Sequence, residues 1–370
     1  MKLPPFRLER YFDRYEFDAP HLLCTSDCES MTVAELLALE PGAEDQLQRL
    51  WLGYTEAPGA PALREAIAGL YDNVGPEDIL VHAGAEEAIF NLMNVVLEPD
   101  DHVVVHAPYY QSLGEVARGI GARVTPWRGD PDRGWALDLD RLADLVDATT
   151  RLVVVNLPHN PTGYLPGAAF LHGLVDLSRR HGFLVFSDEV YRGLELDPDD
   201  RLPAVADLED RAISLGVMSK TYGLAGLRIG WIATRNAAVR DGLAAFKDYT
   251  SICNSAPSEL LATVALRHAA AIAARNVAIV SENLDRLDGF FARHEDLFAW
   301  ERPRAGSIAF PRWLAGDVEA FCADLVQRAG VLLLPGTLYD DRSGGFRIGF
   351  GRRDMPAALE HLEAYLARRR

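Results

Sequence analysis

One lysine is notable both for its position and for the scarcity of its kind. The chain has 37 basic residues, of which only Lys2, Lys220 and Lys247 are lysines. Lys220 follows an apolar run at residues 212–217 that predicts a buried strand, so it should emerge at the carboxyl edge of a sheet. A lysine that is desolvated and close to other cations has a lowered pKa, which makes its amine a nucleophile and a proton carrier. The alternative is an ordinary lysine on a surface loop.

An acidic and an aromatic side chain follow another predicted strand, about thirty residues upstream. Asp188 and Tyr191 come directly after the apolar run at residues 183–187. A carboxylate in this position can keep the nitrogen of a bound heteroaromatic ring protonated, and the Tyr191 hydroxyl could bond an oxygen on the same ring. A carboxylate after a strand also serves as a helix cap or as a magnesium ligand, so the motif alone leaves these alternatives open.

Two loops carry groups that suit a phosphate dianion. Gly84, Ala85 and Glu86 join a strand pattern to a helical pattern, which leaves backbone N–H groups open at a helix N-terminus. Ser219 and Arg228 add a hydroxyl and a guanidinium. Because Arg228 begins an apolar run, where an unpaired charge would be costly, we expect an anion beside it.

Three further residues are candidates with explicit alternatives. Asn160 lies between Pro158 and Pro161, which restrict the backbone so that its amide could point rigidly at a ligand, although tight turns use the same residues. Tyr109 would place an aromatic face at the same sheet edge or pack in the core. Arg347, inside a strand pattern near the C-terminus, would clamp a carboxylate or form a structural ion pair.

The elements that must position these residues alternate between short apolar runs and amphipathic stretches. Several runs, such as residues 152–155, are apolar throughout, as in strands that are buried on both faces. Helical patterns at residues 85–96 and 170–180 lie between the runs. The pattern predicts an α/β fold with a doubly wound, mainly parallel sheet of seven strands. These strands are expected at residues 79–82, 102–107, 123–127, 151–157, 183–187, 212–217 and 228–233.

The pattern changes after about residue 257. Residues 258–293 are typical of one or two long helices, and a smaller α/β unit follows, with strands at 307–310, 331–334 and 346–350 and helices at 317–329 and 356–368. We therefore expect three parts. They are an N-terminal segment (residues 1–45) packing on the small domain and the active site, a large ligand-binding domain (46–257), and an inter-domain helix with a small C-terminal domain (258–370).

Composition limits the partners and the compartment. Apolar residues make up 49% and charged residues 25% of the 370 residues, an ordinary globular balance. The net charge of −17 argues against nucleic acid and against an anionic membrane as partners. The chain has neither an apolar run of membrane-spanning length nor a signal peptide, so we expect a cytoplasmic protein. Its four cysteines are too few for a disulfide scaffold and match no zinc motif.

Together, these motifs resemble the aminotransferase class I/II family of fold type I, which uses pyridoxal 5′-phosphate (PLP), over nearly the whole chain and in the family's order. The resemblance implies PLP as the cofactor, held by Lys220 through a Schiff base, and Arg347 as the clamp on the substrate's α-carboxylate. It also implies roles for the remaining motif residues: Asp188 at the ring nitrogen, Tyr191 and Asn160 near the ring oxygen, Tyr109 on the ring face, and Gly84, Ala85, Glu86, Ser219 and Arg228 at the phosphate.

The resemblance further implies an assembly and a reaction. Tyr54, with Gly59 and Arg64 after it, is similar to a segment of the family in which the tyrosine reaches the phosphate of the neighbouring subunit. This implies a homodimer with shared active sites. The implied reaction is the transfer of an amino group between an amino acid and a 2-oxo acid, during which Lys220 moves the α-proton.

One segment departs from the family. Where many members carry a glycine-rich stretch, residues 22–30 read LLCTSDCES, and this segment resembles the capreomycidine synthase-like branch, which cyclises an arginine derivative. A PLP-dependent lyase, cyclase or oxidase acting on an arginine-like amino acid is therefore the alternative function, and a non-catalytic binding protein is a third. Asp27 and Glu29 would face the substrate side chain and favour a guanidinium or ammonium group. Otherwise, Asp27 would cap a helix that starts near Thr32 or face water.

Overall fold

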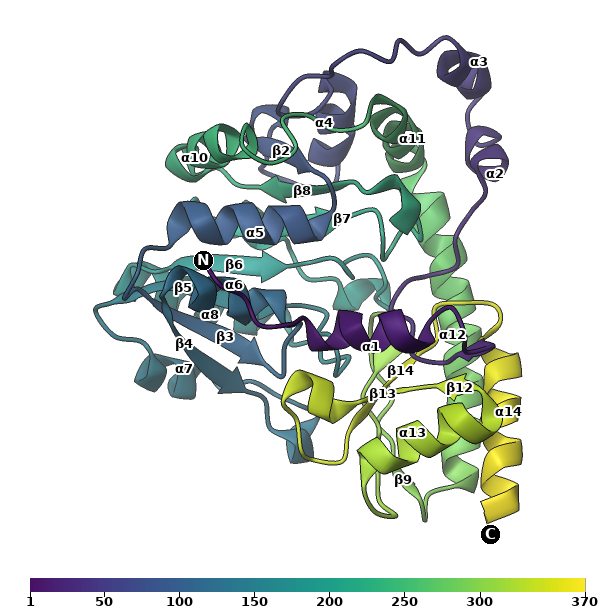
Figure 1. Ribbon diagram of the computed structural model, residues 1–370. Helices are drawn as coiled ribbons and strands as arrows, with labels where there is room; N and C mark the ends of the chain where they lie inside the picture. Colours follow the sequence, from purple (N-terminus) through teal and green to yellow (C-terminus); the bar gives the residue numbers. More distant parts are fainter. Residues whose placement is uncertain (370) are drawn as a thin grey trace.

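A seven-stranded sheet forms the centre of the computed structural model, which describes residues 1–369. In spatial order the strands are β2 (Ile79–His82), β8 (Gly230–Ala233), β7 (Ala212–Val217), β6 (Leu184–Asp188), β5 (Thr150–Asn156), β3 (His102–Ala107) and β4 (Arg123–Arg128). Strand β8 is antiparallel to both of its neighbours, and the other pairs are parallel (Figure 1). The predicted doubly wound, mainly parallel α/β sheet is confirmed.

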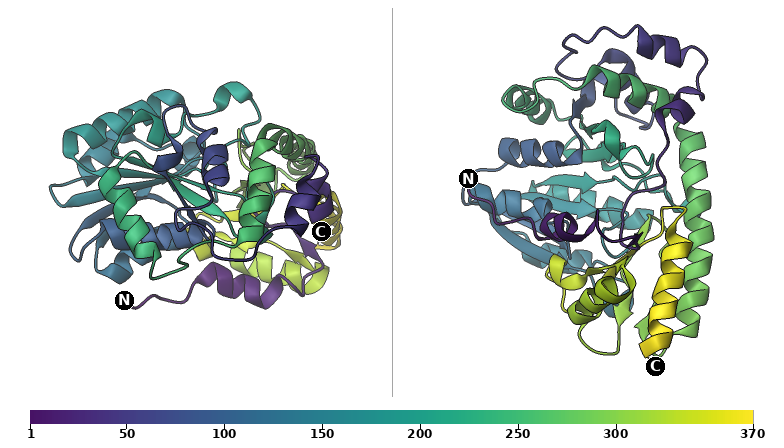
Figure 2. Two further views of the ribbon diagram at one scale, coloured as in Figure 1. Left: turned by 90° about the horizontal axis from the view of Figure 1, so that it is seen from above. Right: turned by 45° about the vertical axis from the view of Figure 1, so that its right-hand side comes forward.

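Helices cover both faces of this sheet because its strands are apolar on both sides. Along β3, Val103 and Val105 pack on one face and Val104 packs on the other, as expected when side chains alternate along a buried strand. Figure 2 shows helices on both sides of the sheet. The first face carries α5 (Ala85–Val96), α6 (Ser112–Ile120) and α10 (Ala237–Lys247), and the other carries α7 (Leu139–Leu145), α8 (Ala168–His181) and α9 (Val205–Leu208).

Two strand boundaries differ from the prediction at residues that matter for chemistry. Strand β6 extends to Asp188, so this carboxylate belongs to the last strand residue and not to the following loop. Strand β8 begins at Gly230 and not at Arg228, because Arg228 adopts a left-handed backbone conformation with a φ of 51° that is incompatible with strand pairing. Arg228 therefore lies in the connection between η4 (Ala225–Leu227) and β8.

Two helices and a group of short strands follow the sheet. The helices α11 (Ala256–Arg267) and α12 (Ala269–Arg293) meet at a bend of 78°. Within residues 1–369 no single helix is long and apolar enough to cross a membrane, and only this bent pair reaches that length and composition together. The remaining elements are β9 (Phe298–Ala299), β10 (Ile308–Ala309), β11 (Arg312–Trp313), α13 (Val318–Ala329), β12 (Val331–Leu332), β13 (Leu334–Pro335), η5 (Gly336–Tyr339), β14 (Phe346–Gly349) and α14 (Met355–Arg369).

The strand predicted at residues 331–334 is divided between two partners. Strand β12 pairs in parallel with β1 (His21–Leu22) from the N-terminal segment, whereas β13 pairs with β14 in antiparallel fashion. The chain changes its hydrogen-bonding partner at Leu333, which no local apolar pattern reveals. The N-terminal segment is thereby hydrogen-bonded to strands from the far end of the sequence.

The N-terminal segment also contains a helix that the sequence reasoning missed. Helix α1 (Arg7–Tyr15) places Leu8, Tyr11, Phe12 and Tyr15 at the i, i+3, i+4 and i+7 spacing of one helix face, a signal that is easily overlooked in nine residues. Figure 1 shows α1 lying across the front of the molecule, between the sheet and the strands β13 and β14. The elements of the chain not yet named are α2 (Val33–Leu37), α3 (Ala43–Gln48), α4 (Pro61–Ala68), η1 (Pro76–Asp78), η2 (Pro131–Arg133) and η3 (Pro198–Asp200).

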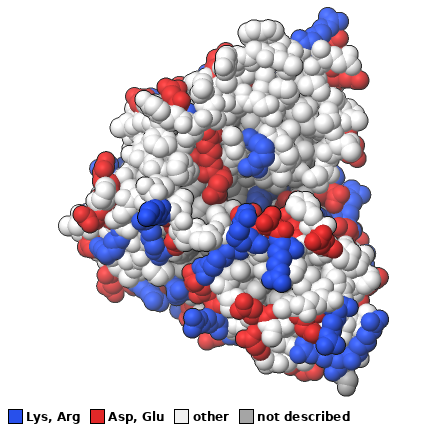
Figure 3. All heavy atoms as spheres, viewed as in Figure 1, with Lys and Arg blue, Asp and Glu red and all other residues white. Residues whose placement is uncertain are grey.

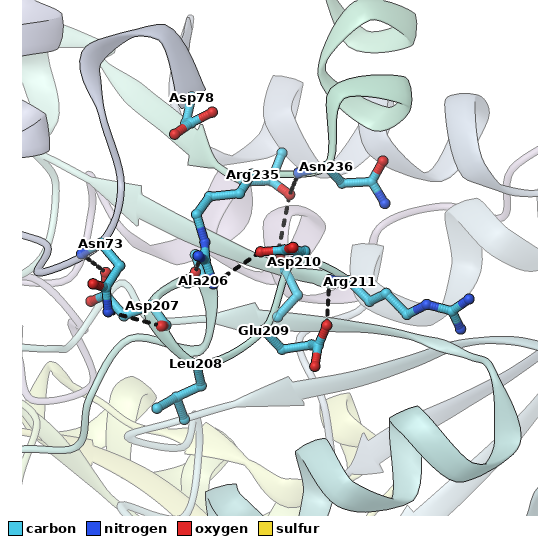
Figure 4. Close-up of polar contacts among 12 residues, drawn as sticks. Asn73, Asp78, Ala206, Asp207, Leu208, Glu209, Asp210, Arg211, Arg235 and Asn236 are labelled. Carbon is cyan, nitrogen blue, oxygen red and sulfur yellow. Dashed lines mark hydrogen bonds and ion pairs between the residues drawn. The ribbon is translucent and has the colours of Figure 1, made fainter.

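A buried carboxylate ties two connections together at the amino end of β7. The Asp207 Oδ1 atom accepts hydrogen bonds from the backbone N–H groups of Asp72 (3.0 Å) and Asn73 (2.7 Å) (Figure 4). The same figure shows Arg235 beside Asp210, an ion pair of 3.1 Å whose carboxylate is 72% exposed. The buried carboxylate and the exposed pair offer a matched comparison.

We predict that Asp207→Ala lowers the free energy of unfolding by about 1–3 kcal/mol, because two backbone donors lose their acceptor away from water. The matched variant Asp210→Ala should change it by less than about 0.5 kcal/mol, since exposed ion pairs contribute little. Urea unfolding followed by circular dichroism measures both changes. Equal stabilities of the two variants would contradict the structural role given to Asp207.

Candidate active site

The carboxyl ends of the parallel strands meet at one edge of the sheet, and most of the predicted site residues gather there. Asn156, the last residue of β5, pairs in register with Asp188, the last residue of β6. Lys220 and Ser219 follow β7 directly. All four line one cavity of about 410 Å³. This shared edge brings together residues that are separated by more than 60 positions in the sequence.

Lys220 projects into the cavity towards the N-terminal segment. Its Nζ atom donates a hydrogen bond to Ser26 Oγ at 2.8 Å. Burial lowers the pKa of Lys220 below its usual value, although the nearby carboxylates of Asp27 and Asp188 act in the opposite direction. A lysine in this setting has a larger neutral fraction, which is the form that attacks a carbonyl carbon and accepts a proton.

Asp188 and Tyr191 supply an acid and a hydroxyl in the same cavity. Burial raises the pKa of Asp188 to about 7, partly offset by the hydrogen bond that its Oδ1 accepts from the Val190 N–H and by Lys220. A cation next to this carboxylate would favour its ionised form. The Tyr191 hydroxyl is buried, with Ser26 beside it, but within residues 1–369 no group meets it in hydrogen-bonding geometry. Both groups therefore have unused capacity towards a ligand.

An anion cradle lies between the start of α5 and the loop before β8. Gly84 has a φ of 89°, which favours glycine, and a Cβ atom at this position would lie 2.5 Å from Arg228 Nη2, so a side chain here would displace the guanidinium. Arg228 forms no ion pair with any residue in the described part of the chain. Together with Ala85 at the helix N-terminus and Ser219, it surrounds a place for a dianion.

Arg347 on β14 is buried, with 2% of its surface exposed. Its Nε donates to the carbonyl oxygen of Cys24 at 3.0 Å. Its Nη1 donates to the Tyr339 hydroxyl at 2.7 Å and to Asn160 Oδ1 at 3.4 Å. These partners are neutral, and no carboxylate among residues 1–369 forms an ion pair with Arg347. A buried guanidinium without a counter-ion fits a ligand that brings its own carboxylate.

One aromatic assignment is corrected by the structure. Tyr110, and not Tyr109, lines the cavity. The Tyr109 ring packs against Gly114, and its hydroxyl accepts a hydrogen bond from Arg118 at 2.8 Å. The reason is that the two neighbouring side chains leave the end of β3 in different directions, and a two-residue aromatic pattern does not reveal which one faces the ligand.

The two N-terminal carboxylates take different places. Asp27 lines the cavity, but its oxygens accept hydrogen bonds from Arg352 at 3.2 and 2.7 Å. Glu29 does not line the cavity, and its Oε2 accepts from the Arg353 N–H at 2.9 Å. Asp27 caps no helix either, because Thr32 caps α2 with its own hydroxyl. Of the two carboxylates expected at the substrate, the structure therefore brings only Asp27 to the cavity, already paired.

Tyr54 and Lys247 lie away from this cavity. Tyr54 is 85% exposed on the surface of the chain, so its expected role in a neighbouring subunit stays a prediction. Lys247 is buried at the end of α10 and donates to the carbonyl oxygens of Ala57 (2.7 Å) and Ile252 (3.3 Å). This hydrogen bonding makes Lys247 a structural residue that fastens two loops.

Several cavity residues were missed by the sequence reasoning. Helix α1 contributes Leu8, Glu9 and Phe12, and Glu16 follows at its C-terminal cap. Figure 3 shows the cavity mouth as a hollow flanked by acidic and basic side chains. Glu86, at the start of α5, adds a carboxyl whose pKa is raised to about 7, because the surrounding protein removes much of its hydration even though solvent reaches it through the mouth. The helical spacing of the apolar residues in α1 was the one local sequence signal that could have predicted this wall of the cavity.

A sheet of this topology with a lysine at its carboxyl edge, beside an anion cradle, defines a class of protein: the fold type I enzymes that use PLP. The comparison with known families is more specific. The chain belongs to the aminotransferase class I and II family, whose model matches residues 22–362. The predicted family and cofactor are thereby confirmed, and PLP is the cofactor.

The most similar proteins carry out more than one reaction. The whole chain is 33% identical to capreomycidine synthase of Streptomyces vinaceus, of which 96% is covered. Among solved structures, a PLP-dependent aminotransferase from Streptococcus suis has a TM-score of 0.94 at 35% identity, with 100% of this chain and 99% of that chain covered. The PLP-dependent cyclase OrfR has a TM-score of 0.89 at 31% identity, with the same coverage. Family membership therefore leaves the reaction open.

The residues of the cavity fit this cofactor. The cradle at Gly84 and the unpaired Arg228 suit its phosphate, and the Tyr191 hydroxyl has no other partner among the described residues. Lys220 would hold its aldehyde carbon, and Asp188 would face its ring nitrogen. The ionised form of Asp188, which burial alone disfavours, would be restored by a protonated ring nitrogen.

We predict that Asp188→Asn retains bound cofactor but exchanges the Cα proton of an amino acid for deuterium about 100- to 1,000-fold more slowly than the natural enzyme, because the fixed charge at the ring nitrogen is lost. Visible absorbance and proton NMR measure the two properties. The matched variant is Glu189→Gln, since Glu189 is equally buried but bonds Val205 and Ser214 outside the cavity. It should exchange at the natural rate, and undiminished exchange in Asp188→Asn would disprove the assignment.

Proposed function

We propose that this enzyme is an aminotransferase that moves an amino group between an amino acid and a 2-oxo acid. The observation that carries the amino-acid substrate of this proposal is that Lys220 and Arg347, which has no carboxylate partner in the described part of the chain, line the same cavity. An amino-acid substrate needs a cation for its carboxylate and a base near its Cα atom, and this cavity offers both. The likeness to an aminotransferase over the full length of the chain supports the same reaction.

Each residue of the cavity has a defined task in this proposal. Bound PLP supplies an electron sink that makes the Cα–H bond of the substrate acidic. Arg347 binds the α-carboxylate through the guanidinium edge that its neutral partners leave free, and so orients the Cα–H bond. Lys220 Nζ would accept the Cα proton and hold it beside the reacting atoms. Leu8 and Phe12 of α1 supply apolar surface that keeps water from the reacting atoms.

A second candidate is a lyase, cyclase or oxidase acting on an arginine-like amino acid. It is favoured by the full-length similarity to capreomycidine synthase and to a PLP-dependent cyclase. The first steps at Lys220 and Arg347 are common to both candidates, because each begins with removal of the Cα proton. The candidates differ in the later steps and products, and only the aminotransferase needs a 2-oxo acid to accept the amino group.

The deciding experiment incubates the holoenzyme with a panel of amino acids, with and without 2-oxo acids, and identifies the products by mass spectrometry. We expect product in excess of the enzyme concentration only when both an amino acid and a 2-oxo acid are present. Lys220→Ala should form none, whereas Lys2→Ala, which removes an exposed lysine near the N-terminus, should behave like the natural enzyme. Product that forms in large excess over the enzyme without any 2-oxo acid would refute the aminotransferase and favour the second candidate.

We also propose a homodimer in which Tyr54 completes the partner's site. Support comes from the exposure of neighbouring large side chains: Trp51 is 79%, Leu52 77% and Tyr54 85% exposed. Such a patch is costly on an isolated chain and typical of an interface. Sedimentation velocity at micromolar concentration should give a dimer of 40.8 kDa subunits, and a single monomer peak would contradict the proposal.

A further inference from the structure

Helix α1 directs two carboxylates towards the cavity. Glu9, Phe12 and Glu16 follow one another at i, i+3 and i+7, so they lie on one side of the helix, and all three line the cavity wall. The sequence reasoning expected the acidic wall to come from Asp27 and Glu29. In the structure Asp27 pairs with Arg352, and the acidic wall is formed instead by the two carboxylates of α1.

Contacts on both sides hold α1 in this orientation. The Arg7 guanidinium donates to both carboxylate oxygens of Asp340 at 2.7 and 2.6 Å. The Arg7 N–H donates to Gln111 Oε1 at 2.9 Å, and the Tyr11 hydroxyl donates to the Leu333 carbonyl oxygen at 3.1 Å. The helix is thus anchored to the loop after β3 and to the C-terminal strands. Its carboxylates are positioned before any ligand arrives.

The two carboxylates lack positive partners. The Glu16 carboxylate forms no ion pair or hydrogen bond with any residue in the range 1–369, and the Glu9 carboxylate accepts only one neutral hydrogen bond there, from the Tyr110 hydroxyl at 3.2 Å. Burial raises the pKa of Glu16, the cations Arg352 and Arg347 lower it, and the neighbouring Glu9 and Asp27 raise it. The nearby cation Arg352 is already engaged by Asp27. A ligand cation would relieve this excess of negative charge.

An independent observation locates the other end of the ligand. The Arg347 guanidinium is buried without a counter-ion, and the Tyr191 hydroxyl in the same cavity is buried without a partner. The Arg347 Cζ atom lies 5.9 Å from the centre of the Phe12 ring, which stands between Glu9 and Glu16 on the helix. An amino acid whose carboxylate reaches Arg347 would therefore lie next to the side of α1 that carries Glu9 and Glu16.

We propose that Glu9 and Glu16 form a recognition site for a cationic side chain, a guanidinium or an ammonium group, on the amino-acid substrate. The inference rests on the proposed function, because it takes the α-carboxylate to lie at Arg347. A positive side chain would neutralise the two carboxylates, which have no ion-pair partner within the described part of the chain. An uncharged side chain would leave them without such a partner. A negative side chain would be repelled.

The test compares binding of arginine, norleucine and glutamate to the holoenzyme. Stopped-flow absorbance in the visible band reports each dissociation constant within the first seconds, before turnover. We expect arginine to bind about 10- to 100-fold more tightly than norleucine, an uncharged amino acid with a side chain of related length, as charged hydrogen bonds imply. Glu9→Gln and Glu16→Gln should each weaken the binding of arginine about tenfold. Neither should change the binding of norleucine, and this unchanged binding also shows that the variants fold.

The matched control is Asp13→Asn, which removes a carboxylate of the same helix that pairs with Arg10 at the surface. It should change neither dissociation constant. Arginine binding that is unaltered in both glutamine variants, or glutamate binding more tightly than arginine, would overturn the recognition site while leaving the aminotransferase proposal in place. A natural enzyme whose spectrum responds to none of the amino acids would overturn both.

Discussion

The buried guanidinium of Arg347 is the constraint on which the site depends. Neutral groups from three distant stretches surround it: Cys24 in the N-terminal segment, Asn160 in the loop after β5 and Tyr339 close before β14. Leaving a charge buried and unpaired costs about 3–5 kcal/mol where a partner has been removed. The three stretches must therefore keep their dipoles directed at the guanidinium. Its negative counter-charge has to be supplied by the ligand.

The same cavity collects charged groups of both signs from the sheet edge and from α1. Lys220, Arg228 and Arg347 supply positive charge near the carboxyl edge of the sheet, while Glu9 and Glu16 supply negative charge from α1. Parallel strands make this possible, because every loop at their carboxyl ends opens on the same side and can contribute a polar group without breaking the apolar layers. Helix α1 closes the remaining side, and its anchors on both halves of the molecule couple the cavity wall to the C-terminal strands.

Much of the arrangement at the sheet edge was predictable from the sequence. Apolar runs locate β2, β3 and β7 without error, because strands buried on both faces admit few polar residues. Residues that follow such runs must meet at one edge, which brings Lys220, Ser219 and Asp188 together before any coordinates are known. Gly84 was also predictable as part of an anion cradle, although its close approach to Arg228 was not.

The tertiary structure alone decided the rest of the cavity. Tyr110 lines the cavity and Tyr109 does not, because the direction of each side chain depends on how the chain turns after β3. Asp27 pairs with Arg352, 325 residues away, and so leaves the acidic wall to α1. Local patterns determine which segments are buried and where their ends meet. They carry no information about which charged groups from opposite ends of the chain become neighbours, since that follows from the packing of the whole fold.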